Sequence, residues 1–296
     1  MITSEIVTDY VNASIDEFNK KLVLYKNNII TMAPPSFEKP LNDFKGGERV
    51  KIPLWVMSNN NEYGVVLRQR KYFGQYKLND LINTWGKNAE GEVARQIINQ
   101  ITNSIYSSMI KMLDAAIPSE NIHDVSAASE TIVTIDKKIE LRDMNEDLQV
   151  LICHSKVFRD LKRISYSDYS SAVLVDGNIQ NGIRLYIAGG RYVWVTDKCP
   201  VDTTIEGCYK YTSFLIGLHQ LFVAVQGGFE FEISRFLSKD LTEMLASINY
   251  VLHLNGVSWK PTAPTNPTMV DFETSANWEL GVSSAEMIKA IKIVSN

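Results

Sequence analysis

Residues 88–118 read NAEGEVARQIINQITNSIYSSMIKMLDAAIP, and this stretch decides the fold. Apolar side chains recur in it every four residues, at Ile97, Ile101, Ile105 and Met109. This spacing places them on one face of an α-helix. Asn88 is a suitable N-cap and Pro118 ends the helix. At 1.5 Å per residue the helix spans roughly 40–45 Å, well over twice the average length. The stretch therefore predicts a long spine helix whose apolar face is core rather than a cofactor site.

A long hairpin is predicted before the spine helix. Residues 50–57 alternate apolar and polar side chains, residues 58–61 read SNNN, and residues 65–70 form a second alternating run. The returning strand carries Arg68, Arg70 and Lys71, more charge than a strand buried on both faces would carry. Either the charges protect the edge of a sheet from aggregation, or the hairpin lies on a neighbouring subunit. The two interpretations are compatible.

The chain before the hairpin is predicted to be an arm without a core of its own. Residues 4–27 have apolar side chains at spacings of three and four, which predicts an amphipathic helix. Residues 32–47 contain three prolines and two glycines without periodicity, which predicts an extended segment. No basic stretch followed by an apolar one begins the sequence, so no export signal is expected. The most apolar run, residues 214–225, is shorter than the roughly 20 residues of a membrane span.

Shorter elements are predicted after the spine helix. They are a helix at 127–141, a strand at 148–153, a helix at 155–164 and a hairpin of strands 183–187 and 192–195 around Gly189-Gly190. Two long antiparallel strands follow, at 229–233 and 248–254, with a loop or short helix at 236–244 between them. These elements together indicate an α+β protein.

Composition excludes several classes of protein. The chain has 296 residues, of which 45% are hydrophobic and 22% charged, as in an ordinary globular protein rather than a disordered tail, a fibre or a small disulfide scaffold. Its 30 basic and 34 acidic residues give a net charge of −4, so any contact with DNA is expected to be local and weak. The three scattered cysteines, Cys153, Cys199 and Cys208, fit a reducing compartment.

Candidate catalytic groups are few. Cys153 and His154 are neighbours, but adjacent residues of a strand point to opposite faces, which suits a buried thiol better than a nucleophile with its base. Cys199 and Cys208 have no histidine at the spacing of a zinc site. The histidines are dispersed, at His123, His154, His219 and His253.

The remaining motifs also argue against an enzyme. His253 is interpreted as a sheet histidine rather than a ligand. Glu230 and Glu232 share one face of a strand, which is interpreted as a solvated or interface-facing side. No GxGxxG, GxxxxGK, GxSxG or HExxH pattern occurs. We therefore expect no catalytic residue, no cofactor and no metal site.

The order of these parts resembles that of the major capsid proteins of tailed bacteriophages with the Hong Kong 97-type fold. Residues 148–161 (LQVLICHSKVFRDL) are similar to the entry of the A-domain in that family, where a strand runs into a helix. Further similar segments are 188–200 (AGGRYVWVTDKCP), 211–217 (YTSFLIG), 231–235 (FEISR), 252–259 (LHLNGVSW), and 266–268 with 277–279. The resemblance covers about residues 46–296 and depends on many short segments in the right order.

The resemblance implies an α+β fold with an N-arm, an E-loop hairpin, a P-domain with the spine helix and an antiparallel sheet, and an A-domain. The implied boundaries are 1–46 for the N-arm, 47–87 for the E-loop, 88–150 and 226–296 for the two parts of the P-domain, and 151–225 for the A-domain. The E-loop residues expected to contact other subunits are Trp55, Asn59, Asn60, Asn61, Arg68, Arg70, Lys71 and Tyr72.

The same resemblance implies a function and partners. It implies a major capsid protein whose hexamers and pentamers form the icosahedral head shell around double-stranded DNA, in a virion assembled in the host cytoplasm. The implied partners are a separate scaffolding protein, portal and head-completion proteins and, non-specifically, the packaged DNA; no membrane partner is expected. Two alternatives stay open, an encapsulin-like compartment shell and a small-molecule enzyme that uses Cys153 or His154.

Overall fold

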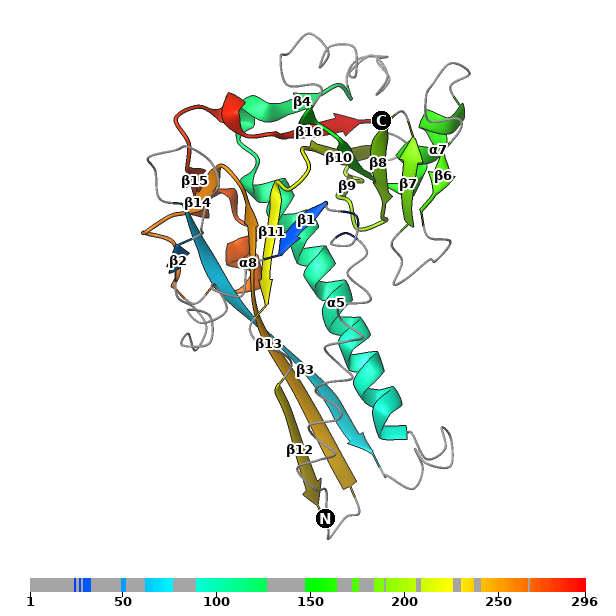
Figure 1. The fold of residues 1–296 in the computed structure, drawn as a ribbon, viewed down its shortest axis with the longest axis vertical. Coiled ribbons are helices and arrows are strands. Elements are labelled where there is room, and N and C mark those ends of the chain that lie inside the picture. The colour runs from blue at the N-terminus through cyan, green and yellow to red at the C-terminus, as the bar shows by residue number, and fades with distance from the viewer. Residues whose placement is uncertain are drawn as a thin grey trace.

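The computed structural model describes residues 24, 27, 29–32, 49–51, 62–76, 89–126, 147–163, 172–175, 184–188, 190–205, 209–225, 230–236, 241–265 and 267–296. Two sheets lie at the two ends of an elongated molecule, and one long helix, α5, runs along the lower sheet and up to the other (Figure 1). The predicted helix at 127–141 and nearly all of the predicted helix at 4–27 lie outside the described residues.

The predicted spine helix is confirmed as α5, Ala89–Ala116. Its 28 residues span about 42 Å. The four side chains of the predicted stripe, Ile97, Ile101, Ile105 and Met109, are at most 1% exposed. Thr102 lies on the same buried face and donates its hydroxyl hydrogen bond to the Ile98 carbonyl at 2.8 Å, so its polar group costs little there.

One sheet has six strands, and α5 packs against one of its faces. The strands are β1 (Ile30–Met32), β2 (Arg49–Lys51), β3 (Tyr63–Tyr76), β11 (Leu221–Val225), β12 (Glu230–Phe236) and β13 (Leu241–Leu254). Their order is β1-β11-β13-β3-β2, and β12 also pairs with β13. The arm therefore contributes a strand, because β1 pairs in parallel with β11.

The six-stranded sheet differs from the sequence predictions at two places. The hairpin is present, since Arg49 pairs with Val65, but its returning strand β3 is 14 residues long. The prediction of a loop or short helix at 236–244 is wrong for residues 241–244, because Phe236 pairs with Leu241 and β13 begins there. Hydrogen bonding to strands on both sides outweighs the weak local pattern of that segment.

The second sheet has eight shorter strands. They are β4 (Ile122–Asp124), β5 (Val150–Cys153), β6 (Val173–Leu174), β7 (Arg184–Ala188), β8 (Arg191–Val195), β9 (Val201–Asp202), β10 (Lys210–Ile216) and β16 (Ala290–Ser295). Their order is β4-β16-β10-β5-β8-β7-β6, and β9 pairs with β10. The predicted β7–β8 hairpin is confirmed, with Ala188 opposite Arg191 and Gly190 at a φ of 73° in the turn. Helix α7 (Ser155–Arg163) is also as predicted.

A small C-terminal unit lies beside the six-stranded sheet. It contains β14 (Val257–Trp259), β15 (Trp278–Leu280), the short helix α8 (Met269–Phe272) and the 3₁₀ turns η5 (Ser275–Asn277) and η6 (Ala285–Met287); a third 3₁₀ turn, η2 (Ser119–Asn121), follows α5. Gly256 turns the chain from β13 into β14 at a φ of 94°, and a Cβ there would lie 2.7 Å from Ile288 Cγ1. Only glycine suits that position.

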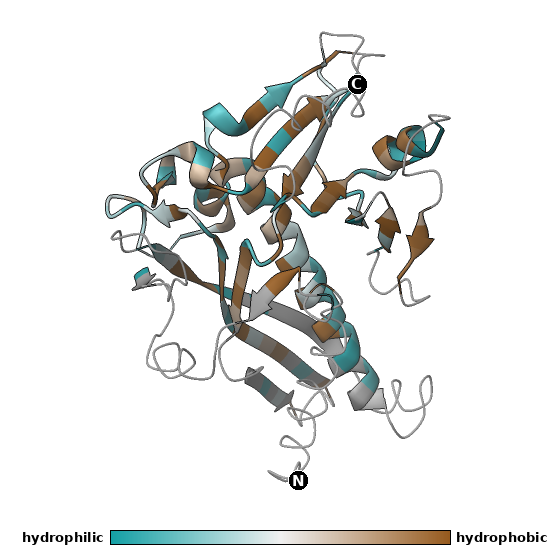
Figure 2. Cartoon of the chain, turned by 45° about the horizontal axis from the view of Figure 1, so that its top comes forward, coloured by the Kyte–Doolittle hydropathy of each residue, from teal (hydrophilic) through white to brown (hydrophobic). Residues whose placement is uncertain are grey.

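The core is continuous from one sheet to the other. One cluster of buried side chains joins α5 to the inner faces of both sheets, and Tyr106 of α5 meets Trp194 of β8 edge-on with ring centroids 5.7 Å apart. A second cluster fills the outer face of the eight-stranded sheet beneath α7. In Figure 2, α7 carries both brown and teal residues, as expected for a helix that covers a core with one face.

The two sheets do not follow the domain boundaries expected from the sequence. Strand β11, expected in the A-domain, belongs to the six-stranded sheet, whereas β16, expected in the P-domain, pairs with β10 of the eight-stranded sheet. Strand β4 follows α5 and pairs in parallel with β16. The chain therefore crosses between the two sheets three times, from β3 through α5 to β4, from β10 to β11, and from β13 to β16.

Candidate assembly surface

The base of the long hairpin is fixed to the C-terminal unit. Arg49 of β2 donates from Nε and Nη2 to the Trp259 carbonyl, at 3.1 and 2.8 Å. Its guanidinium lies 4.2 Å from the centroid of the Tyr63 ring, and the Tyr63 amide donates to Ser258 Oγ at 3.1 Å. These contacts join residues about 200 positions apart and hold both ends of the segment 52–61.

A buried pair reinforces this base. Glu62 is 1% exposed and His253 of β13 is fully buried, with Glu62 Oε2 3.0 Å from His253 Nε2. The same carboxylate oxygen accepts from the Gly256 amide at 3.1 Å. Removing one member of such a pair leaves the other desolvated without its partner, which is costly. We call Arg49, Glu62, Tyr63, His253, Ser258 and Trp259 the hairpin anchor.

Three aromatic side chains pack together in the core of the C-terminal unit. The rings of Trp259, Phe272 and Trp278 pack together with centroids 5.1–6.1 Å apart. Trp278 Nε1 donates to the Phe272 carbonyl at 3.1 Å. Helix α8 begins with a capping box in which the Asp271 carboxylate accepts from the Thr268 amide at 2.8 Å; the Thr268 bonds lower the pKa of Asp271.

The far part of the six-stranded sheet presents a polar face opposite α5. Arg68 and Arg70 of β3 are exposed, and they lie opposite Asn249 and Ser247 of β13, which are buried. Register puts Glu232 and Ser234 of β12 on the same face, where both are exposed. Phe236 follows them and is 42% exposed. We call these five residues, Arg68, Arg70, Glu232, Ser234 and Phe236, the assembly surface.

The predicted contact residues divide into three groups. Arg68 and Arg70 are brought together on the assembly surface. The backbones of Lys71 and Tyr72 continue β3, opposite Ala246 and Leu245. Trp55, Asn59, Asn60 and Asn61 lie outside the described residues. The exposure of Glu232 agrees with the solvated or interface-facing side predicted from alternation.

Sequence reasoning missed the hairpin anchor. Glu62 and Arg49 appear in the sequence as ordinary loop and strand charges, and their partners follow 191 and 210 residues later. The one available signal was His253, an ionisable residue in an otherwise apolar strand. It was interpreted as a sheet histidine, and the structure adds that its partner is a carboxylate from the base of the hairpin.

The two candidate catalytic groups are poorly suited to nucleophilic chemistry. Cys153 is fully buried, and burial raises the pKa of its thiol well above the ordinary value of 9.0, with Cys199 adding to the effect. His154 Nδ1 accepts from the Lys156 amide at 3.1 Å, while Nε2 lies 3.4 Å from Asp197 Oδ1. The imidazole therefore interacts with the backbone at the start of α7 and with Asp197, and not with the Cys153 thiol.

The described parts of the chain contain neither a cluster of metal-ligating side chains nor a helix that could span a membrane. Within those ranges, no three His, Cys, Asp or Glu side chains come together as a metal site. No helix in them is long and apolar enough to span a membrane.

Comparison with solved structures identifies the fold class. The capsid of Ralstonia phage GP4 superposes with a TM-score of 0.53 at 9% identity, over 77% of this chain and 83% of that one. A virus-like particle from Pyrococcus furiosus (TM-score 0.49, 14% identity, 98% of both chains) and the head of Helicobacter pylori bacteriophage KHP40 (0.47, 11%, 90% and 87%) are also similar. The match to the Ralstonia phage GP4 capsid shows that the chain has the phage capsid fold of the Hong Kong 97 type.

The family follows from the sequence itself. Residues 68–289, well over half of the chain, match the family model described as major capsid protein 13-like. The chain belongs to this family and is a major capsid protein of the phage type, which places it in the capsid of a virion. A search of curated proteins finds no match.

Proposed function

We propose that the chain assembles with copies of itself, as hexamers and pentamers, into an icosahedral head shell around the double-stranded DNA of a tailed bacteriophage. The hairpin anchor is the observation that carries this proposal. It fixes the base of the hairpin to the C-terminal unit, and overlap of a neighbouring subunit by residues 52–61 is part of the proposal. Trp55 and Asn59–Asn61 would then contact that neighbour.

The assembly surface suits repeated, weak contacts. It combines two arginines with a glutamate and a half-exposed phenylalanine, so a copy of the same chain can offer complementary charge. An exposed ion pair contributes only about 0–1 kcal/mol. In a closed shell, however, every subunit makes the same contacts several times, and their effects accumulate through multivalency.

The other partners follow from this role. A separate scaffolding protein and the portal and head-completion proteins would meet the shell during assembly in the host cytoplasm. A chain with a net charge of −4 would touch packaged DNA only locally and non-specifically. The proposed role is structural, and the raised pKa of the buried Cys153 thiol supports a role without nucleophilic catalysis.

Deleting residues 55–60 tests the proposal while it leaves Glu62 and Tyr63 of the anchor in place. We expect the variant to fold, as judged by circular dichroism, and to lose closed shells in electron microscopy and sedimentation. The variant Lys156→Gln, on α7 beside the eight-stranded sheet, should assemble normally. Normal shells in normal yield from the deletion variant would refute the overlap. Staining purified particles for nucleic acid separates a phage head from an encapsulin-like compartment.

A further inference from the structure

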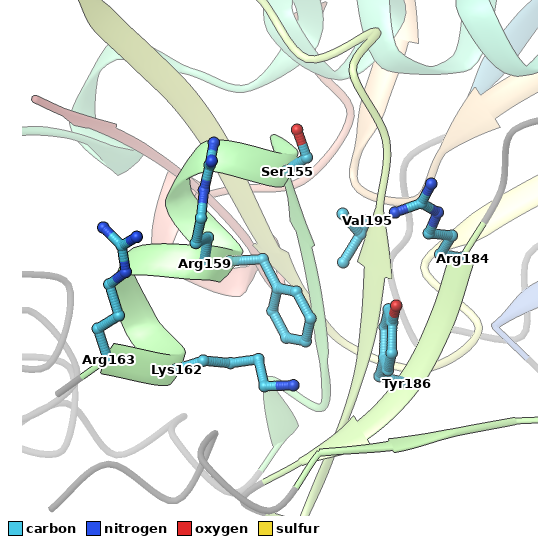
Figure 3. A pocket seen from close by; sticks show the side chains of 8 residues that line it. Ser155, Arg159, Lys162, Arg163, Arg184, Tyr186 and Val195 are labelled. Atoms are coloured by element: carbon cyan, nitrogen blue, oxygen red, sulfur yellow. The ribbon is translucent and has the colours of Figure 1, made fainter. Parts of the chain in front are cut away.

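A pocket of about 570 Å³ lies on the outer side of the eight-stranded sheet, between α7 and the β7–β8 hairpin (Figure 3). Its floor is apolar and includes Phe158 and Tyr186, whose ring centroids are 4.7 Å apart. Its rim is basic. Three of the basic side chains come from α7, at Arg159, Lys162 and Arg163, and the fourth is Arg184 of β7 on the facing wall.

The fold explains why these basic side chains line the pocket. Helix α7 buries Val157, Phe158 and Leu161 against the core, so positions 159, 162 and 163 must lie on its solvent side. In Figure 3, Lys162 reaches across the pocket toward Tyr186, and its Nζ lies 5.7 Å from the Phe158 ring centroid. Arg159, Arg163 and Arg184 are all exposed.

Among the described residues, the positive charge of the pocket has few acidic neighbours. None of the eight described residues that line the pocket is acidic. Asp160, the nearest acid in α7, pairs instead with Lys156 at 2.9 Å. Asp197 is hydrogen bonded chiefly by Ser155, which lowers its pKa, and Arg184 contributes only weakly to that lowering. Four like charges around one cavity repel each other, and a multivalent anion would relieve this repulsion.

We propose that this pocket is a phosphate-binding site, filled either by a small polyphosphate, such as a nucleoside triphosphate, or by consecutive phosphates of a nucleic-acid strand. Guanidinium groups bind phosphate oxygens through paired hydrogen bonds, and three of the four cations are arginines. The volume falls in the range of small-ligand pockets and exceeds the need of a single phosphate. A concave site of this size admits a single strand or a nucleotide better than a duplex.

Binding measurements on the purified full-length protein test the site. Pyrophosphate, ATP and an eight-nucleotide single strand are titrated separately, by calorimetry or fluorescence anisotropy, into the wild type and the double variant Arg159→Gln/Arg163→Gln. We expect about a tenfold or greater loss of affinity in the variant, because two charge-assisted contacts are removed. For the oligonucleotide, the salt dependence should also fall by about one unit of log–log slope or more.

Two further variants make the result specific. Lys156→Gln removes a cation from the same helix outside the pocket and should bind like the wild type. Arg184→Gln removes one from the opposite wall and should weaken binding, even if the α7 double variant misfolds. Binding of pyrophosphate and ATP would indicate that the ligand is a small polyphosphate. Binding of the oligonucleotide alone would indicate that the ligand is a nucleic-acid strand.

Three outcomes would overturn the proposal. The first is that the wild type binds none of the three probes, and the second is that Lys156→Gln loses as much affinity as the pocket variants. The third is unchanged phosphate binding with altered shell formation in Arg159→Gln/Arg163→Gln, because the pocket would then receive carboxylates of a neighbouring subunit. Sedimentation of the same samples reports assembly separately, so a failure of the proposed shell function is distinguishable from a failure of this site.

Discussion

The two sheets bury their strands in different ways. The eight-stranded sheet has short strands with a core on each face, one shared with α5 and one beneath α7. The six-stranded sheet has two 14-residue strands whose far part is covered by α5 on one side and carries exposed charges on the other. The first arrangement suits a compact body, and the second suits an extended surface that other subunits can contact. Substitutions in the two regions should therefore differ in kind.

The largest effect on stability is expected at Trp194, in the eight-stranded sheet. It is fully buried and packs edge-on against Tyr106, so Trp194→Ala should lower the free energy of unfolding by about 3–5 kcal/mol. Trp194 Nε1 has no hydrogen-bond partner in the described parts of the chain, so Trp194→Phe should be much milder. Phe236→Ala, at the 42% exposed end of β12, should change stability by less than about 0.5 kcal/mol. Urea unfolding measures all three, and equal losses at Trp194 and Phe236 would contradict the comparison.

A slightly smaller effect is expected at Glu62, which joins the extended sheet to the C-terminal unit. Glu62→Ala leaves His253 buried without its carboxylate partner, and we expect a loss of about 3 kcal/mol. The double variant with His253→Ala should lose less than the sum of the single losses, because the two residues share one interaction. Strict additivity in a double-mutant cycle would show that the pair contributes nothing.

Gly281 gives an independent measure of the same anchor. A Cβ at this position would lie 2.6 Å from Glu62 Cγ, so Gly281→Ala must displace the Glu62 side chain. We expect a loss of about 1–3 kcal/mol from overpacking. In a Glu62→Ala background the same substitution should cost clearly less, since the Glu62 side chain is gone and only the 3.2 Å approach to the Val257 carbonyl oxygen remains. If Gly281→Ala lowers the free energy of unfolding equally in both backgrounds, the Glu62 side chain is not the group that it displaces.

The difference between the two regions also limits what the sequence can predict. Local patterns predicted α5, α7 and the β7–β8 hairpin, because the periodicity of a helix and the chemistry of a tight turn are recorded within a few residues. The pairing of β1 with β11 and of β4 with β16 joins short segments that are far apart in the chain, and no local pattern marks either pair. The anchor was missed for the same reason. Arg68 and Arg70 could be selected because unusual charge in a strand is itself a local signal.

A weak dependence on pH is expected at the entry of α7. Hydrogen bonds from Ser155 hold the pKa of Asp197 below its ordinary value of 3.8. A carboxyl with a lowered pKa in the folded state adds stability above pH 3.8, and this contribution disappears as the pH falls through the lowered pKa. The Asp197 side chain is 71% exposed, so the effect is small. Asp197→Asn should be slightly less stable than the wild type at neutral pH, and this difference should shrink as thermal unfolding is measured below pH 3.8. A constant difference would rule out this linkage.

The smallest effect on stability, and the most informative for function, is expected on the assembly surface. Arg68→Glu/Arg70→Glu changes two exposed side chains and should alter the free energy of unfolding by less than about 0.5 kcal/mol. Shell formation should nevertheless weaken, most strongly at low salt, because exposed charges are screened over a Debye length of about 10 Å at 0.1 M ionic strength. The same reversal at Arg159 and Arg163, on the compact region, should leave assembly unchanged. Sedimentation across a salt series compares the two. If both reversals impair assembly equally, the extended sheet has no special role as a contact surface, and net charge alone governs the association.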